Sequence, residues 1–374
     1  MPKGDTKGEM KEGVEQVAVP AKPQGKMTLW LKKRPVQITL VVVVLAVVAL
    51  AGFLLTRTDD SDDGQVIVTN TNQPSEQKVR RVLDGVLDVA ANKNPRPVGV
   101  MIENLSIVRP QSGLGQANVV YEALVEGGIT RFLAVYLLTD DIPELGPVRS
   151  ARPYYVDWAN ELGAIYAHAG GSPTALADIR SKDVFDLDQF YNSQYYWRKN
   201  LPRATEHTLF TSTELLQFAL RDKEATMTGD YTGWKFKEEA ALADRPLEVN
   251  PIVLDYSSKS YEVKYTYNRE ENTYLRFQGD EAHTDQNTGE QISPKNVLVQ
   301  YVGTRLADAT RLSMDVVGSG DAILFRDGEA IPARWSKSST SARTIFTDLE
   351  GQQLIFNAGQ TWVQVFPDDR QVTY

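Results

Sequence analysis

The chain has 374 residues, a net charge of −9 and no cysteine. The absence of cysteine excludes disulfide scaffolding, thiol catalysis, cysteine-ligated metals and lipid attachment through a cysteine of this chain. Charge is unevenly distributed, because residues 1–35 carry eight Lys and Arg against four Asp and Glu, which leaves −13 for the remainder. Nucleic-acid-binding domains are typically basic, so we expect no nucleic-acid partner.

Residues 36–55, VQITLVVVVLAVVALAGFLL, contain no charged side chain. Twenty residues in a helix rise about 30 Å, which matches the hydrocarbon core of a bilayer. Basic residues at 32–34 precede the run, and acidic residues at 59–63 follow it. This asymmetry predicts a cytoplasmic tail over 1–35, one transmembrane helix over 36–55 and an extracellular C-terminal part, in a single-pass protein of a bacterial cytoplasmic membrane. A cleaved signal peptide is the alternative, but the apolar run is long for one.

Polar residues dominate 56–95, which we interpret as a stalk, with a short amphipathic helix predicted over 76–91. Residues 96–240 then alternate between strand-like and helix-like segments. The strand-like segments are VGVMIEN, NVVYEALVE, RFLAVYLL and GAIYAHA, and the helix-like segments are ARPYYVDWANEL, SPTALADIR and TSTELLQFALRD. Ser172 followed by Pro173 is a typical helix start. The alternation predicts an α/β (or α+β) subdomain.

Residues 241–374 change to short strands separated by turn residues. The predicted strands are PIVLDYS, YEVKYTYN, TYLRFQ, NVLVQYV, DAILFRDG, TIFTD, QLIFN and TWVQVFP. Short strands at regular spacing predict a mostly antiparallel β-rich subdomain. The expected fold is therefore an α/β subdomain and a β-rich subdomain behind one transmembrane helix.

Four polar clusters follow apolar strands, where α/β proteins tend to place their binding sites. They supply the candidate ligand-binding residues, which are Glu103, Arg109, Arg131, Arg149, Arg152, His168, Gly170, Gly171 and Ser172, with His207 added as a further histidine. If the strands are parallel neighbours, Glu126, Arg149, Arg152, His168 and Ser172 should line one cleft. The alternative for Ser172 is a plain N-cap after a tight turn, which explains the same residues without a ligand.

Glu126 is the candidate catalytic residue, because two glycines follow it and burial would raise its pKa as a general acid requires. The alternative is a buried ion pair with Arg131 or Arg149. Arg149 and Arg152 are three residues apart and would point the same way on a helical turn, toward a carboxylate or phosphate. The alternative for these two arginines is a structural ion pair with Glu122 or Asp157.

No metal site and no cofactor is expected. The three histidines, His168, His207 and His283, show no ligand spacing. Several aromatic residues are candidates for a sugar groove, although aromatics in a β domain more often belong to the core. They are Tyr195, Tyr196, Trp197, Trp335 and Trp362.

Long segments of the chain resemble the YerB-like family, bacterial envelope proteins with a domain of unknown function in two parts. The segments are RPVGVMIENLSIVRPQSGLGQANVVYEALVEGGITRFLAVY, GPVRSARPYY and HAGGSP, and later HTDQNTGE, NVLVQY, GSGDAILFRDG, ARWSK and AGQTWVQVFP. The resemblance covers roughly residues 95–370 and implies a membrane-tethered extracytoplasmic protein with two subdomains. Family members are often lipoproteins, whereas this chain has no cysteine. The resemblance implies no particular reaction.

Two functions remain open at this point. The first is an envelope protein that binds an anionic or glycan cell-wall ligand near Arg149, Arg152 and His168. The second is an enzyme that cleaves wall glycan, a hydrolase or a protein like the lytic transglycosylases, with Glu126 as the acid. An enzyme needs a proton donor within reach of the bound sugar, and a binding module does not.

Overall fold

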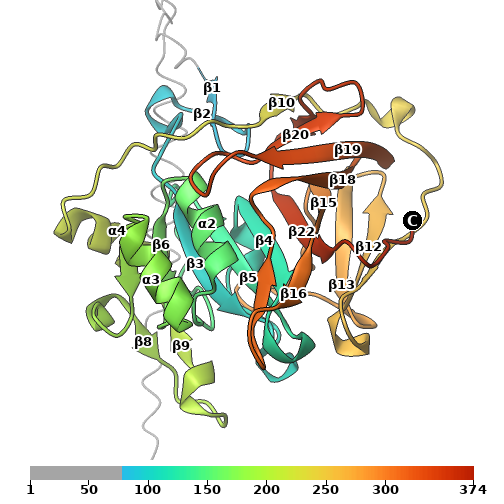
Figure 1. Ribbon diagram of the computed structural model, residues 1–374. Helices are drawn as coiled ribbons and strands as arrows, with labels where there is room; N and C mark the ends of the chain where they lie inside the picture. Colours follow the sequence, from blue (N-terminus) through green and yellow to red (C-terminus); the bar gives the residue numbers. More distant parts are fainter. Residues whose placement is uncertain (1–77) are drawn as a thin grey trace, which may run out of the picture. The chain divides into compact units, whose positions relative to one another are not determined.

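The computed structural model describes residues 78–374 (Figure 1). The predicted tail, the predicted transmembrane helix and the stalk up to residue 77 lie outside the described residues. Within residues 78–374, no helix has the length and apolar character needed to cross a bilayer.

A ten-stranded mixed sheet forms the centre of this part of the chain. Its strands, in spatial order, are β20 (Ile345–Asp348), β19 (Glu329–Lys337), β18 (Gly318–Arg326), β15 (Asn296–Val302), β22 (Thr361–Pro367), β4 (Val119–Leu124), β5 (Thr130–Tyr136), β3 (Val98–Glu103), β6 (Ile165–His168) and β7 (Asp186–Asp188). The strands therefore come from both the earlier and the later half of the described chain.

The strand directions decide which loops meet. β3, β6 and β7 are mutually parallel, β5 runs antiparallel to both β3 and β4, and β22 runs parallel to both β4 and β15. β4 consequently runs in the same direction as β3 and β6. The last long strand of the chain, β22, joins the earlier strands to the later ones by backbone hydrogen bonds on both of its sides.

Three α-helices are present among the described residues: α2 (Pro153–Glu161), α3 (Pro173–Ser181) and α4 (Thr213–Asp222). The Ser172 hydroxyl accepts a hydrogen bond from Ala175 N at 3.2 Å, and Ser212 caps α4 in the same way. Every residue of β3, β4, β5 and β6 is buried, which fits strands covered on both faces. The side chains of α2 and α3 pack in one core cluster and those of α4 in another.

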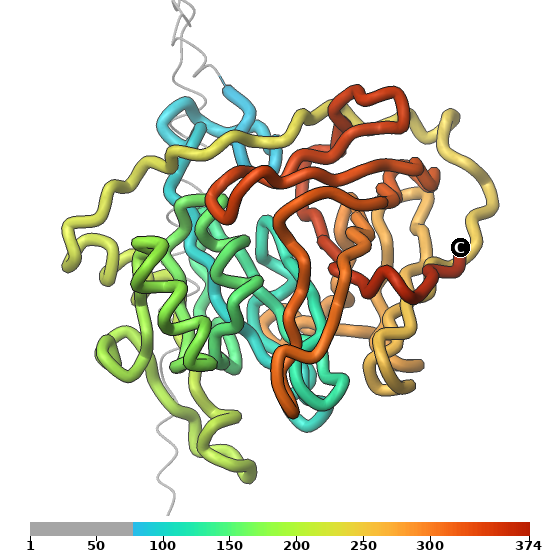
Figure 2. The backbone as a smooth tube through the Cα atoms, in the orientation of Figure 1, coloured from blue at the N-terminus to red at the C-terminus, as the bar shows by residue number. Residues whose placement is uncertain are grey.

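The remaining strands form smaller sheets. β11 (Ile252–Asp255), β12 (Glu262–Asn268), β13 (Thr273–Gln278) and β14 (Glu281–Ala282) make a four-stranded antiparallel sheet. Four two-stranded sheets pair β1 (Val79–Arg80) with β2 (Leu87–Asp88), β8 (Trp197–Arg198) with β9 (Leu209–Phe210), β10 (Lys235–Lys237) with β21 (Ile355–Asn357) and β16 (Thr304–Leu306) with β17 (Leu312–Met314). The yellow segment in Figure 2 leads from the helical side, through β10, to these later strands.

The structure corrects the prediction of a helix over 76–91. β1 and β2 form a hairpin there, and Leu83 is 1% exposed. The turn contains Asp84–Gly85, and Gly85 has a φ of +70°, a conformation that glycine adopts without strain. Residues 78–95 of the predicted stalk are therefore part of the folded structure. The described fold is mostly β with few helices, and it combines a large mixed sheet with an antiparallel sheet of later strands, as expected for the later part of the chain. In the earlier part, strands and helices alternate only from β5 through α2, β6 and α3 to β7.

A polar network lies inside the molecule and links its two halves. The side chains of Glu122 on β4 and Arg276 on β13 are both 0% exposed and form an ion pair at 2.9 Å. Arg276 Nε donates to His283 Nδ1 at 2.8 Å, and His283 Nε2 lies 2.8 Å from Gln111 Oε1. The guanidinium also lies over the Trp362 ring, 4.3 Å from its centroid. These contacts hold the four-stranded sheet against the central sheet.

Candidate functional site

The carboxyl ends of β3, β4 and β6 meet at one edge of the sheet, because these strands run in the same direction. Glu103 ends β3, His168 ends β6, and Glu126 follows β4 by two residues. Arg131, near the start of the antiparallel β5, lies at the same edge. Most of the candidate residues from the sequence thus lie at the edge of the sheet where β3, β4 and β6 end.

Glu103 is held between two partners at this edge. His207 Nδ1 lies 2.8 Å from Glu103 Oε2, and Arg149 Nε lies 3.2 Å from Glu103 Oε1. Glu103 is 4% exposed and His207 is 9% exposed. Arg149 Nη1 donates to the Glu206 carbonyl at 3.0 Å. The three side chains form one cluster in which the Arg149 side chain is the most exposed member.

Glu126 pairs with Arg152, the residue before α2, with Arg152 Nε 2.6 Å from Glu126 Oε1. Burial by itself raises the pKa of Glu126, but the hydrogen bonds and charge of Arg152 outweigh burial and leave the pKa below its ordinary value. This direction is opposite to the one that a general acid requires. An ion pair was expected for Glu126, but with Arg131 or Arg149, and the structure corrects the partner.

Arg149 and Arg152 do not share a helical turn, because α2 begins at Pro153 and Arg152 has an extended backbone. The expected pairs of these arginines with Glu122 or Asp157 are also wrong, since Glu122 binds Arg276 and Asp157 binds Lys182. Arg131 is 7% exposed and donates to the Ser150 carbonyl at 2.6 Å. Burial and the neighbouring positive charges of Arg152 and Arg149 lower its pKa.

His168 is fully buried, and both of its ring nitrogens face acceptors. Nδ1 lies 2.8 Å from the Gly170 carbonyl and Nε2 lies 2.9 Å from Asp186 Oδ1. Both contacts are hydrogen bonds only when the ring carries two protons. Gly170 has a φ of +63°, and its N–H donates to Asp188 Oδ1 at 2.9 Å. The turn before α3 is therefore fixed by β7.

A cavity of about 660 Å³ lies beside this turn. Its charged and aromatic lining residues are Arg149, Arg180, Arg198, Asp186, Asp188, Glu206, Phe190 and Tyr191. Of the five residues expected in one cleft, only Arg149 lines it, together with Gly170 and Gly171. His168 and Ser172 are not lining residues, since His168 is buried against its two acceptors and the Ser172 hydroxyl caps α3. Glu126 and Arg152 are occupied with each other outside the lining.

Two arginines of the cavity are exposed and have no carboxylate partner within residues 78–374, namely Arg180 on α3 and Arg198 on β8. Arg198 donates to the Thr205 carbonyl at 2.6 Å and to Gln189 Oε1 at 3.3 Å. Phe190 and Tyr191 are 68% and 85% exposed. Cationic groups beside exposed rings are suited to a ligand with a carboxylate or phosphate and an apolar or sugar face.

Arg109 is a structural residue. Its guanidinium donates to the Asn104 side chain at 3.0 Å and to the Ser260 carbonyl at 2.8 Å, and burial lowers its pKa. Tyr195, Tyr196, Trp335 and Trp362 are buried, so they are core aromatics. In the part of the chain that the structure describes, no group of three or more His, Asp or Glu side chains is arranged to hold a metal ion.

The candidate residues from the sequence did not include Arg180, Arg198, Asp186, Phe190 or Tyr191. One signal was available in FDLDQFY, since two aspartates alternate with apolar residues as in a strand and two aromatics follow. The arginines carried no such signal. Arg180 lies in the last turn of a helix and Arg198 in a two-residue strand, and only the fold brings them to the cavity.

Comparison with known proteins places the chain in a family. The family described as "Protein of unknown function (DUF3048) N-terminal domain" matches residues 83–226, and its C-terminal counterpart matches residues 252–363. The chain belongs to this family. It is 29% identical over 304 residues to a Bacillus subtilis (strain 168) protein named "Putative lipoprotein YerB", covering 78% of this chain and 87% of that one.

The fold agrees with a solved member. The crystal structure of the YerB protein from Bacillus subtilis matches with a TM-score of 0.71 and 28% identity, over 79% of this chain and all of that one. The resemblance to the YerB-like family inferred from the sequence is confirmed.

Proposed function

We propose that this chain is a membrane-anchored envelope protein that binds an anionic or glycan cell-wall ligand in the cavity beside α3. The observation that carries the proposal is the pair of exposed arginines, Arg180 and Arg198, on a cavity rim that also presents Phe190 and Tyr191. A guanidinium binds a carboxylate or phosphate with two parallel hydrogen bonds, and an aromatic ring packs on the apolar face of a sugar.

Attachment to the membrane is the second element of the proposal. The predicted span over 36–55 would supply the anchor and leave residues 78–374 outside the cell. The name of the Bacillus subtilis relative describes a lipoprotein, which supports membrane attachment in the family by a different chemical means.

Binding is preferred to cleavage because of the state of Glu126. Its carboxylate forms two hydrogen bonds with Arg152, at 2.6 and 2.7 Å, and its pKa lies below the ordinary value. A glycosidic general acid must hold its proton near neutral pH, which requires the opposite shift. Glu126 is thus suited to position Arg152 at the edge of the sheet.

The test is sedimentation of the full-length protein, in detergent micelles, with isolated cell wall. The Arg180→Ala/Arg198→Ala double variant should bind at least about tenfold more weakly, since two charge-assisted contacts are lost. Both side chains are exposed, so folding should be unchanged. Arg221→Ala, an exposed arginine of α4 outside the cavity, is the matched control and should bind like the unchanged protein.

The same incubation separates binding from cleavage. Soluble fragments released from the wall are measured beside the pellet. We expect no release above the level without protein, and no difference between the unchanged protein and Glu126→Gln. Release that disappears in Glu126→Gln would support the enzyme. Equal pelleting of the double variant and the control would contradict a ligand in this cavity.

A further inference from the structure

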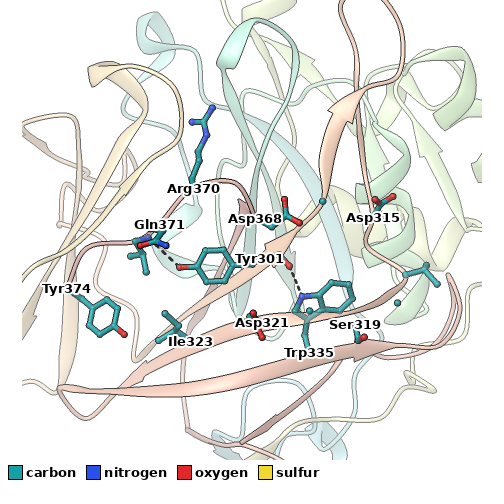
Figure 3. Close-up of a pocket in the computed structure, with 15 residues that line it drawn as sticks. Tyr301, Asp315, Ser319, Asp321, Ile323, Trp335, Asp368, Arg370, Gln371 and Tyr374 are labelled. Carbon is teal, nitrogen blue, oxygen red and sulfur yellow. Dashed lines mark hydrogen bonds between the residues drawn. The ribbon is translucent and has the colours of Figure 1, made fainter. Parts of the chain in front are cut away.

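A second cavity, of about 600 Å³, lies in the opposite half of the central sheet, on β15, β18 and β19 (Figure 3). The chain that follows β22 borders it and contributes Asp368, Arg370 and Tyr374. Of its lining residues, the sequence had pointed only to Trp335, as one of the aromatic candidates for a sugar groove. It shares no residue with the cavity beside α3.

Fixed aromatic rings form the floor of this cavity. Trp335 is 2% exposed, and its indole Nε1 donates to the Tyr301 carbonyl at 2.7 Å. The Tyr301 hydroxyl accepts a hydrogen bond from Val372 N at 3.4 Å, as the dashed lines in Figure 3 show. Gly320 allows the close approach, because a Cβ there would lie 2.5 Å from the indole nitrogen. Tyr374 adds a ring that is 49% exposed.

Carboxylates surround this aromatic floor. Asp315 and Asp321 pair with Arg305 at 2.6 Å and with Arg334 at 3.4 Å, and all four side chains are more than half exposed. Exposed pairs of this kind contribute at most about 1 kcal/mol, so a ligand can replace the arginine. Asp368 is exposed, and its carboxylate takes part in no ion pair within residues 78–374.

The cation in the lining does not neutralise these acids. Arg370 Nη1 donates to the Asp255 carbonyl at 3.0 Å and also to the Tyr256 carbonyl. In Figure 3 its side chain points away from Tyr301 and Trp335. Among the lining residues, three carboxylates therefore stand against one guanidinium, while the arginines that pair with Asp315 and Asp321 lie outside the lining. The faces of the aromatic rings also attract cations.

We propose that this cavity binds an aliphatic primary ammonium group carried on a peptide, such as a lysine side chain. The methylene groups would pack on Tyr301 and Tyr374, and the ammonium would lie among the carboxylates of Asp315, Asp321 and Asp368. A cavity of this volume holds one long side chain and the adjoining peptide groups. The site goes beyond the wall-ligand proposal, because it selects the opposite charge at a separate place.

The experiment is isothermal titration of the full-length protein, in detergent micelles, with N-acetyl-Gly-Lys-Gly-amide. The same peptide with an acetylated ε-amine is the matched ligand control, since it keeps the shape and loses the charge. We expect saturable binding of the free amine, weakened by salt, and at least about tenfold weaker binding of the acetylated peptide.

Three variants locate the binding. Asp321→Asn/Asp368→Asn should weaken binding of the free amine at least about tenfold, with an unchanged melting temperature because both side chains are exposed. Asp183→Asn/Asp280→Asn removes the same charge from exposed positions outside the cavity and should bind like the unchanged protein. Tyr374→Ala should weaken binding, and its melting temperature separates this effect from the loss of the contact between the Tyr374 and Phe325 rings.

Three outcomes would overturn the proposal. They are equal binding of the free and acetylated peptides, equal binding by the two double variants, and no saturable binding of the free amine. Binding of a neutral chitotriose that depends on Tyr374, with none of the lysine peptide, would assign the cavity to a sugar and reject the ammonium.

Discussion

Glu122 and Glu126 stand four residues apart on one segment, yet they belong to two regions that behave differently. Glu122, inside the molecule, has no exposed surface and binds the equally buried Arg276. Its second oxygen accepts a hydrogen bond from Thr130 Oγ1 at 2.7 Å. Glu126, at the edge, binds Arg152, and these two side chains are 26% and 14% exposed.

The difference shows how burial assigns a role to a charged pair. A fully buried ion pair has no water to replace a lost partner, so its members are committed to the fold. A partly exposed pair can exchange a partner for water or a ligand at smaller cost. The interior of this sheet is therefore structural, and its carboxyl-end edge is where binding is expected. The following predictions test that division, from the largest expected effect to the smallest.

Glu122→Ala should cost about 3–5 kcal/mol of unfolding free energy, because it leaves the Arg276 charge buried without a partner. Equilibrium unfolding in urea measures the loss. The double variant Glu122→Leu/Arg276→Met is the control and should be more stable than the single variant, since no buried charge remains. A loss below about 1 kcal/mol in Glu122→Ala would show that water reaches this region.

Stability should fall as the pH drops below the ordinary histidine pKa, because of His283. Burial, and then the Arg276 charge, lower the pKa of His283 well below 6.5. Arg276 Nε is a donor, so Nδ1 must accept and cannot be protonated without loss of the bond. The unfolded chain takes up the proton and the folded chain does not, so unfolding becomes easier by about 1.4 kcal/mol per pH unit below about pH 6.5.

Urea unfolding at several pH values between neutral and mildly acidic measures this slope. His283→Gln is the control, because an amide can accept from Arg276 and donate to Gln111 without titrating. In this variant the pH slope of the unfolding free energy should be smaller by about 1.4 kcal/mol per pH unit, which is the contribution of one proton. An unchanged slope would mean that His283 is not the group responsible.

Glu126→Gln should cost only about 1 kcal/mol at neutral pH, as expected for a partly exposed pair. The folded-state pKa of Glu126 lies below the unfolded value, so its contribution is present above about pH 4.5 and is lost as the pH falls through the folded-state pKa. A double-mutant cycle with Arg152→Ala at two pH values measures the coupling. A coupling as large as that of Glu122 with Arg276 would remove the distinction between edge and interior.

The local sequence predicted most elements well. The helices that follow Ser172 and Ser212 begin as expected, because capping depends on neighbouring residues. The long apolar runs form β3, β4, β5, β15 and β22. β19 was missed, since Pro332 interrupts the pattern. The structure accommodates this proline where β20 no longer pairs with β19, because the pairing begins at Ala333.

The order of the elements along the chain and their residue types could not reveal the cavity beside α3. The sequence determined that polar residues follow apolar strands, that two helices have capped starts, and that the chain resembles a known family. Only the tertiary structure decided that Glu126 binds Arg152 while Glu122 binds Arg276, and that Arg180 and Arg198 share a cavity. Glu122 and Arg276 are 154 positions apart, and strand direction, which local patterns do not encode, brings such residues together.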